Sequence, residues 1–173
     1  IEGKIFASTK PKLISKENPI ANTEGALNAI TVTTDQLKNL YLEGEGAGGF
    51  PTASSVLSDI YEISYNSNYK SLGFAQSKLV KFEKFNSSDL ETKYYLRIRV
   101  TDEPGVLSKI TSYFNDENIS VEKILQFPDN NSDGIPILIT THKIKSSRLL
   151  SSVKKIEDLD FVFENISVIP IEY

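Results

Sequence analysis

The 173-residue chain has no cysteine, no methionine and no tryptophan, and its single histidine is His142. Without cysteine, disulfide bonds, thiolate metal sites and cysteine nucleophiles are excluded. One histidine argues against a multi-histidine metal site and against a serine–histidine triad. No apolar run approaches the roughly 20 residues of a membrane-spanning helix, and no secretory signal pattern opens the sequence, so we expect a cytoplasmic protein. The net charge is −4 without a basic block, which gives no indication of a nucleic-acid partner.

Methionine is also absent from position 1, and the chain opens on I-E-G-K-I, a strand-like pattern. We therefore expect a piece of a longer polypeptide that begins inside a domain.

Composition divides the chain into three segments. Residues 1–65 contain strand-like stretches and a glycine-rich loop, and residues 66–92 are rich in serine, asparagine and lysine, as in a linker. Within this linker Leu79, Val80, Phe82 and Phe85 could form one short strand that docks on a neighbour. Residues 93–173 form a self-contained pattern of their own.

That pattern predicts the order βαββαβ, an α+β fold with four antiparallel strands and both helices on one face. Polar and apolar residues alternate through K-Y-Y-L-R-I-R-V, which predicts a strand. Asp102 can cap the following helix, and Pro104 is tolerated in its first turn. The remaining elements are expected as strands at 119–127 and 135–141, joined by the turn-rich P-D-N-N-S-D-G, a helix from about 146, and a strand at 161–171.

Residues 93–173 resemble the ACT domain, a small-molecule-sensing module of amino-acid metabolism. The resemblance is carried by D-E-P-G-V-L-S-K-I-T-S-Y-F and by N-I-S-V-E-K-I-L-Q, and D-x-P-G-V-L is its most specific part. It implies an amino-acid effector, held at a dimer interface by the loop between the first strand and the first helix. Asp102 would take the ammonium group, Gly105 would let the ligand approach the backbone, and Ser120 would contribute from the second strand. The free amides around Val106 and Leu107 suit a carboxylate.

Another interpretation stays open for these residues. Asp102 could be only a helix cap and Gly105 only a turn residue, in a domain that dimerises without a ligand. The side chains of Val106 and Leu107 are expected in the core under either interpretation.

The stretch G-E-G-A-G-G-F-P-T carries three glycines with the spacing G-x-G-x-x-G, at Gly44, Gly46 and Gly49. A Rossmann fingerprint would need a βαβ unit and an acidic residue about 20 positions further on. Tyr69 stands there instead, and no βα repeat follows, so we do not expect a Rossmann loop.

Residues 1–65 instead resemble the end of the catalytic region of homoserine dehydrogenase. Three segments carry the match: P-K-L-I-S-K-E-N-P-I-A, E-G-A-L-N-A-I-T-V and G-E-G-A-G-G-F-P-T-A-S-S-V-L-S-D-I. The resemblance implies contact with a nicotinamide cofactor, NAD(P), through Gly46, Ala47, Gly48 and Thr52. The alternative interpretation is that this segment serves packing alone, since the small residues around 53–55 could let a helix lie close to a sheet.

The family's Rossmann domain and catalytic residues would lie upstream of Ile1, so the fragment is expected to be inactive alone and to bind no cofactor tightly. The parent enzyme would interconvert homoserine and aspartate 4-semialdehyde, on the route to threonine and methionine, with threonine as the effector. The alternatives are a non-catalytic ACT-type dimerisation module, or a ligand-binding protein unrelated to dehydrogenases.

Overall fold

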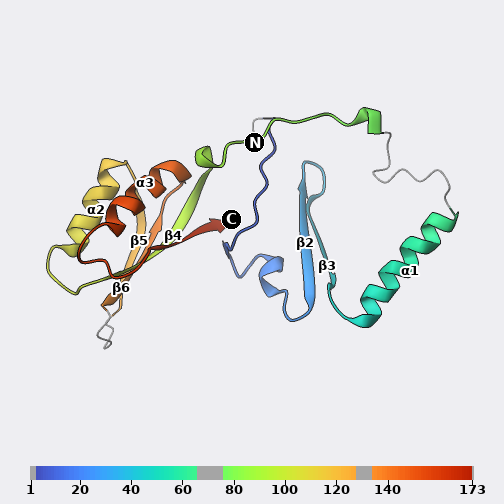
Figure 1. Cartoon of the computed structure of the whole chain (residues 1–173), viewed down its shortest axis with the longest axis horizontal. Coiled ribbons are helices and arrows are strands. Elements are labelled where there is room, and N and C mark those ends of the chain that lie inside the picture. Colours follow the sequence, from blue (N-terminus) through green and yellow to red (C-terminus); the bar gives the residue numbers. More distant parts are fainter. Residues whose placement is uncertain (1–2, 66–75, 128–133, 173) are drawn as a thin grey trace. The chain divides into compact units, whose positions relative to one another are not determined.

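The computed structural model describes residues 3–65, 76–127 and 134–172. The chain divides into two compact units, one of residues 1–14 with 82–173 and one of residues 15–81 (Figure 1). The predicted boundaries at 65, 92 and 93 stay a prediction from sequence. The structure adds that the first 14 residues belong with the C-terminal unit. Most of the predicted 128–134 turn lies outside the described residues.

The C-terminal unit is built on a sheet with the strand order β1-β8-β4-β6-β5. Its four long strands are antiparallel, as predicted: β4 (Glu91–Val100), β5 (Val121–Gln126), β6 (Ile135–Thr141) and β8 (Ser167–Glu172). Two short strands extend it, since β1 (Leu13–Ile14) pairs in parallel with β8 and β7 (Ile144–Lys145) pairs with the start of β4. The short 3₁₀ helix η3 (Ser87–Asp89) precedes β4.

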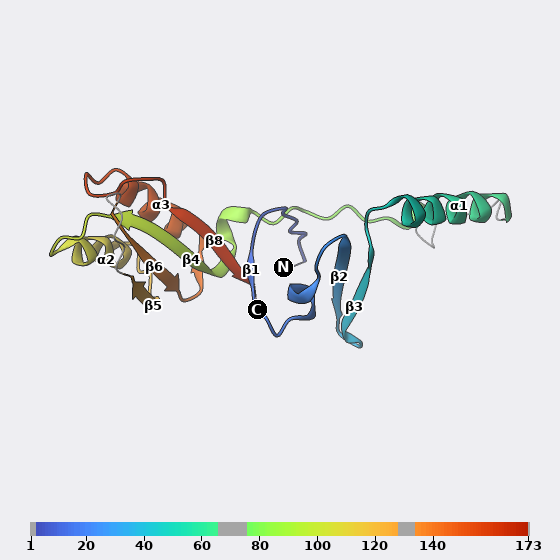
Figure 2. The same cartoon turned by 90° about the horizontal axis from the view of Figure 1, so that it is seen from below.

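Helices α2 (Val106–Asp116) and α3 (Ser146–Glu157) complete the predicted βαββαβ order (Figure 2). Every second residue of β4 from Tyr94 to Val100 is buried, and α2 buries residues spaced four apart, Val106, Ile110 and Phe114. These side chains form one apolar core with those of β6 and α3. Alternation along the strand and i, i+4 spacing along the helix therefore identified the core faces correctly.

Two details of the prediction were wrong. Gly105, not Asp102, is the residue at the N-terminus of α2, and Pro104 precedes the helix instead of lying in its first turn. The last strand begins at Ser167, not at 161, because Val162 makes only an isolated bridge to Val100.

The N-terminal segment is held against the C-terminal unit at two places. The amide of Ile5 donates to the carbonyl of Glu83 at 2.9 Å, and the amide of Phe85 donates to the carbonyl of Ile5 at 2.8 Å. Phe6 meets Phe85 edge to face. Further along, β1 pairs with Ile171 and Glu172 at the end of β8, and β5 forms the opposite edge of the sheet. The strand expected at 79–85 is reduced to the bridge between Lys84 and Ile5.

The other unit consists of a hairpin and a helix. Strands β2 (Leu27–Thr34) and β3 (Lys38–Glu45) pair antiparallel, and α1 (Gly49–Tyr65) follows; two 3₁₀ turns lie at η1 (Pro19–Asn22) and η2 (Gln76–Lys78). Because β2 and β3 are antiparallel and no parallel strand follows α1 in the described part of residues 15–81, the G-x-G-x-x-G spacing belongs to a hairpin-to-helix corner. No helix within the described residues is long and apolar enough to cross a membrane.

Candidate effector site and glycine corner

The loop between β4 and α2 carries the carboxylate of Asp102, which forms no hydrogen bond or ion pair with the described residues. Gly105 has φ 94°, a left-handed conformation that strains any residue with a side chain, and open space surrounds the position of its missing Cβ. No side chain caps α2. Among the described residues the Asp102 carboxylate has no hydrogen bond or ion pair, so its interpretation as a helix cap is wrong.

The backbone of the same loop offers hydrogen-bond donors. The amide of Val106 is held weakly by the carbonyl of Glu103 at 3.4 Å, and within the described residues no backbone acceptor pairs with the amides of Leu107 and Ser108. Such free amides at a helix N-terminus favour an anion. The side chain of Val106 is buried and that of Leu107 packs against the core, as predicted, so the backbone of these two residues is what a ligand can reach.

Ser120 lies at the opposite end of the sheet from this loop. The loop follows Val100, which pairs with Ile135, whereas Ser120 precedes Val121, which pairs with Thr141. Six residues of β6 separate the two places, about 20 Å at roughly 3.3 Å per residue. One chain therefore does not bring Ser120 to Asp102.

One contact near the loop escaped the sequence analysis. The ammonium group of Lys109 lies 5.7 Å from the centre of the Phe161 ring, and the carbonyl of Phe161 accepts from the amide of Thr101 at 3.1 Å. These contacts fasten the start of α2 to the segment before β8. Lys109 and Phe161 lie 52 positions apart in the sequence, and no sequence motif joins them.

The glycine corner is tight at Gly46. A Cβ there would lie 1.8 Å from Nδ2 of Asn28 on the neighbouring strand, and the amide of Gly46 donates to the carbonyl of Ala26 at 3.0 Å. Gly48 has φ 123°, and its carbonyl accepts from the amide of Thr52 at 3.2 Å. The sequence analysis missed Asn28 as a site residue, although its segment, E-G-A-L-N-A, was one of the three that matched.

The corner supplies backbone and small side chains. Gly46, Ala47, Gly48 and Thr52 lie in sequence where β3 ends and α1 begins, and all are exposed except where Asn28 covers Gly46. Within the described residues, no group of three acidic or histidine side chains could hold a metal ion. The arrangement suits close approach by a flat or phosphorylated ligand and offers no group for proton transfer.

Family models match both halves of the chain. Residues 2–61 match homoserine dehydrogenase, and residues 94–161 match the ACT domain. The chain is 33% identical over 162 residues to homoserine dehydrogenase of Helicobacter pylori and 34% identical over 174 residues to that of Bacillus subtilis. These alignments cover 94% and 98% of this chain, and 38% and 40% of the relatives.

This chain corresponds to the C-terminal region of homoserine dehydrogenase, ending in an ACT domain. A solved homoserine dehydrogenase from Thiobacillus denitrificans superposes with a TM-score of 0.80 at 31% identity, covering 94% of this chain and 38% of that one. The Staphylococcus aureus enzyme at pH 6.0 superposes with a TM-score of 0.53 at 17% identity, over 95% of this chain and 37% of that one, and supports the fold alone.

The region thus spans about two fifths of the length of the curated homoserine dehydrogenases it matches. The glycine corner lies inside the segment that matches homoserine dehydrogenase, and the β4–α2 loop lies inside the ACT segment.

Proposed function

We propose that this homoserine dehydrogenase region regulates a cytoplasmic, NAD(P)-dependent enzyme that interconverts L-homoserine and L-aspartate 4-semialdehyde. In this proposal the ACT domain binds the amino acid threonine, a product of the same biosynthetic route. The observation that carries the proposal is the β4–α2 loop, where an unused carboxylate adjoins free backbone amides.

The loop has the two charges that an α-amino acid requires. The carboxylate of Asp102 can pair with the ligand's ammonium group, and the amides of Leu107 and Ser108 can donate to its carboxylate. Such charge-assisted hydrogen bonds are stronger than neutral ones. The left-handed turn at Gly105 keeps side-chain atoms out of the space between the two groups.

A second copy of the chain would complete the site. β5 is a six-residue edge strand of the sheet, and its unpaired side offers a place for sheet-to-sheet pairing. If two β5 strands pair antiparallel, the N-terminal end of one lies beside the C-terminal end of the other. That arrangement brings Ser120 of a second copy toward the Asp102 loop of the first and accounts for their separation within one chain.

The glycine corner is proposed to contact the cofactor of the parent enzyme through Gly46, Ala47, Gly48 and Thr52. Its residues fit a contact role, since they keep side chains away from the backbone and start α1 with exposed amides. When bound, NAD(P) would supply the hydride chemistry. Because the chain spans only about two fifths of the length of its relatives, we expect the chain alone to transfer no hydride.

Calorimetric titration of the whole chain with threonine tests the sensing role. We expect saturable heat, which Asp102→Asn abolishes and Asp116→Asn, a conservative change on the same unit, leaves unchanged. A titration without heat, or equal heat in Asp102→Asn, would overturn the proposal.

Mixing two variants tests whether the site is shared between copies. Asp102→Ala and Ser120→Ala chains should each bind threonine poorly as pure dimers. In a mixed dimer, one of the two sites pairs an intact Asp102 with an intact Ser120, so binding should return at about half the normal stoichiometry. If each site lies within one chain, mixing restores nothing.

A role in assembly alone is the second candidate, and the exposed β5 edge favours it. Leu125 on this strand is 52% exposed, as expected of a surface that pairs with another copy. A stable dimer in analytical ultracentrifugation, with no heat on threonine addition, would support assembly over sensing.

A further inference from the structure

Two adjoining cavities lie at the start of β4, where the N-terminal segment contacts the rest of the C-terminal unit. This unit contains the ACT domain and is called the ACT unit below. Their volumes are about 610 and 310 Å³, and both are lined by Leu90 and Glu91. All of their lining residues belong to the same compact unit. The cavities are at the opposite end of β4 from the β4–α2 loop, about 30 Å away at roughly 3.3 Å per residue.

Lysine dominates the charge around the two cavities. Three acidic side chains, Asp89, Glu91 and Glu172, face six lysines, although the whole chain has a net charge of −4. The lysines come from three separate stretches of sequence, and they are Lys4, Lys10, Lys12, Lys84, Lys143 and Lys145. No arginine lines either cavity.

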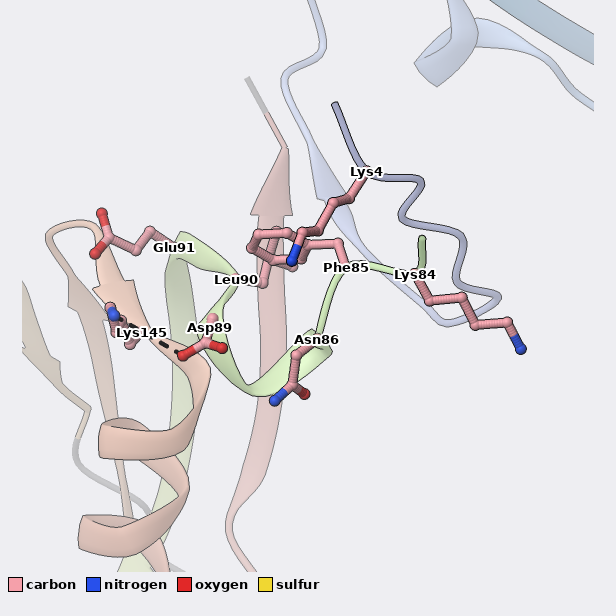
Figure 3. Close-up of a pocket in the computed structure, with 8 residues that line it drawn as sticks. All are labelled: Lys4, Lys84, Phe85, Asn86, Asp89, Leu90, Glu91 and Lys145. Carbon is pink, nitrogen blue, oxygen red and sulfur yellow. Dashed lines mark ion pairs between the residues drawn. The ribbon is translucent and has the colours of Figure 1, made fainter. Parts of the chain in front are cut away.

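Half of these lysines are not neutralised by an acidic partner. Lys145 reaches Asp89 at 3.8 Å, and Lys12 pairs with Glu172 (Figure 3 shows the first of these). Among the described residues Lys10, Lys84 and Lys143 form no ion pair. Figure 3 also shows the side chain of Lys84 directed away from Asp89. Lys10 and Lys143, which both line the smaller cavity, are therefore the cations most available to a ligand.

We propose that the smaller cavity binds the phosphate group of a small phosphorylated molecule, with Lys10 and Lys143 as its cations. Lysine is a compact point charge with three donors, and it binds phosphate in this way in other proteins. The smaller cavity taken alone has three lysines and two carboxylates, Glu91 and Glu172, and Glu172 is paired with Lys12.

The floor of the cavity can accept the uncharged part of such a ligand. Pro170 is buried and Phe6, Leu90 and Ile171 are half-buried, so an apolar surface adjoins the lysines. Lys10 belongs to the N-terminal segment and Lys143 to the turn after β6, so a bound anion would link the segment to the sheet. This site does not depend on the proposed threonine site.

Titration with inorganic pyrophosphate, at constant ionic strength, tests the proposal on the whole chain. We expect saturable shifts of the amide resonances of 90–92 and 170–172, and slower hydrogen exchange in 4–14. Lys10→Gln and Lys143→Gln should each weaken binding about tenfold, as expected for loss of a charge-assisted hydrogen bond. Lys154→Gln, an exposed lysine on α3 outside both cavities, should leave binding unchanged.

Three outcomes would overturn the proposal. Pyrophosphate could fail to saturate, or Lys154→Gln could weaken binding as much as Lys143→Gln, which would indicate a general charge effect. Citrate, a carboxylate anion of similar charge, could bind as tightly as pyrophosphate, which would contradict the phosphate assignment. Because lysine-to-glutamine changes on the surface keep the fold, each result reports on binding.

Discussion

The two units of the chain differ in where their apolar side chains lie. Among its described residues, the ACT unit has a core cluster of sixteen buried apolar side chains between one face of its sheet and its two helices. In the described part of residues 15–81 no residue is buried, and Ile30 on β2 is 62% exposed. Both units form regular strands and helices, but only the ACT unit buries side chains in a core. A sequence pattern that predicts strands and helices therefore does not by itself predict a buried core.

Residues 15–81, called the hairpin unit here, expose apolar side chains that another part of a protein would be expected to cover. A two-stranded hairpin is at best marginally stable by itself in water. Along α1 the exposed apolar residues lie on one side of the helix, at the spacing of an amphipathic helix: Phe50, Val56, Leu57, Ile60, Tyr61 and Ile63. The curated relatives are more than twice as long as this chain, and we expect the rest of such a protein to cover these surfaces.

The largest difference between the units should appear when the same substitution is made in each. Ile98→Ala removes a fully buried side chain of β4 and should lower the free energy of unfolding by about 2–5 kcal/mol. Ile30→Ala removes an exposed one and should change it by less than about 0.5 kcal/mol. Urea denaturation followed by circular dichroism measures both. Equal losses would mean that the hairpin already packs against a partner within this chain.

A second prediction separates crowding from backbone strain within the ACT unit. Gly134 and Gly105 both have positive φ, 79° and 94°. A Cβ on Gly134 would lie 2.5 Å from the carbonyl oxygen of Val100 and 2.4 Å from the Phe163 ring, whereas Gly105 faces open space. Gly134→Ala should therefore cost about 2–4 kcal/mol, and Gly105→Ala about 1–2 kcal/mol.

The same denaturation experiment decides this prediction. If the two alanine variants are equally stable, the Phe163 ring and the Val100 strand end move aside without cost, and the contact at Gly134 is not a constraint.

The features predicted correctly from the sequence are those that depend on residues close together in the chain. Alternation in β4 and the spacing of Val106, Ile110 and Phe114 identified the core face and the βαββαβ order, because both patterns are local consequences of backbone geometry. The residues of the β4–α2 loop were singled out by the resemblance of one short motif to the ACT domain, and their role in binding an effector stays a prediction.

Features that join distant segments could not be predicted. The parallel pairing of Leu13 with Ile171 and the contact of Gly46 with Asn28 depend on tertiary packing, which no local pattern encodes. The start of α2 also differs from the prediction. Gly105, in a left-handed conformation, is its N-cap residue, and no side chain, that of Asp102 included, caps the helix. The lysine-lined cavities combine three stretches of sequence, each unremarkable alone.

A smaller, pH-dependent effect is expected where α2 meets α3. Hydrogen bonds from Lys155 and Ser151 lower the pKa of Glu117, and the same pairing raises the pKa of Lys155. The stability that Glu117 contributes is present above its unfolded pKa and is lost as the pH falls through its lower folded pKa. The contribution of Lys155 is full below its unfolded pKa and is lost as the pH rises through its higher folded pKa.

Glu117→Gln should therefore flatten the acid limb of the stability profile and cause a small loss at neutral pH. Glu62→Gln, on α1 of the hairpin unit, is the matched control and should leave the profile unchanged. Denaturation midpoints from pH 3 to pH 8 compare them, and a parallel acid limb in Glu117→Gln and the parent chain would contradict the assignment.

The smallest effect is expected at Tyr94, and its sign is informative. Its side chain is 3% exposed, yet within the described residues its hydroxyl group has no hydrogen-bond partner. Tyr94→Phe keeps the ring in the core and removes an unsatisfied polar group, so it should be neutral or stabilising by up to about 1 kcal/mol. Tyr41→Phe is the contrasting change on the hairpin, where the hydroxyl bonds to Thr23 at 2.9 Å and to Glu43.

Amide hydrogen exchange should then be faster in β3 of Tyr41→Phe and unchanged or slower in β4 of Tyr94→Phe. In the unit with a closed core an unpaired hydroxyl is a cost, whereas in the open unit a paired hydroxyl is one of the few contacts that hold the hairpin. A loss of stability in Tyr94→Phe would mean that its hydroxyl finds a partner in solution, such as a buried water.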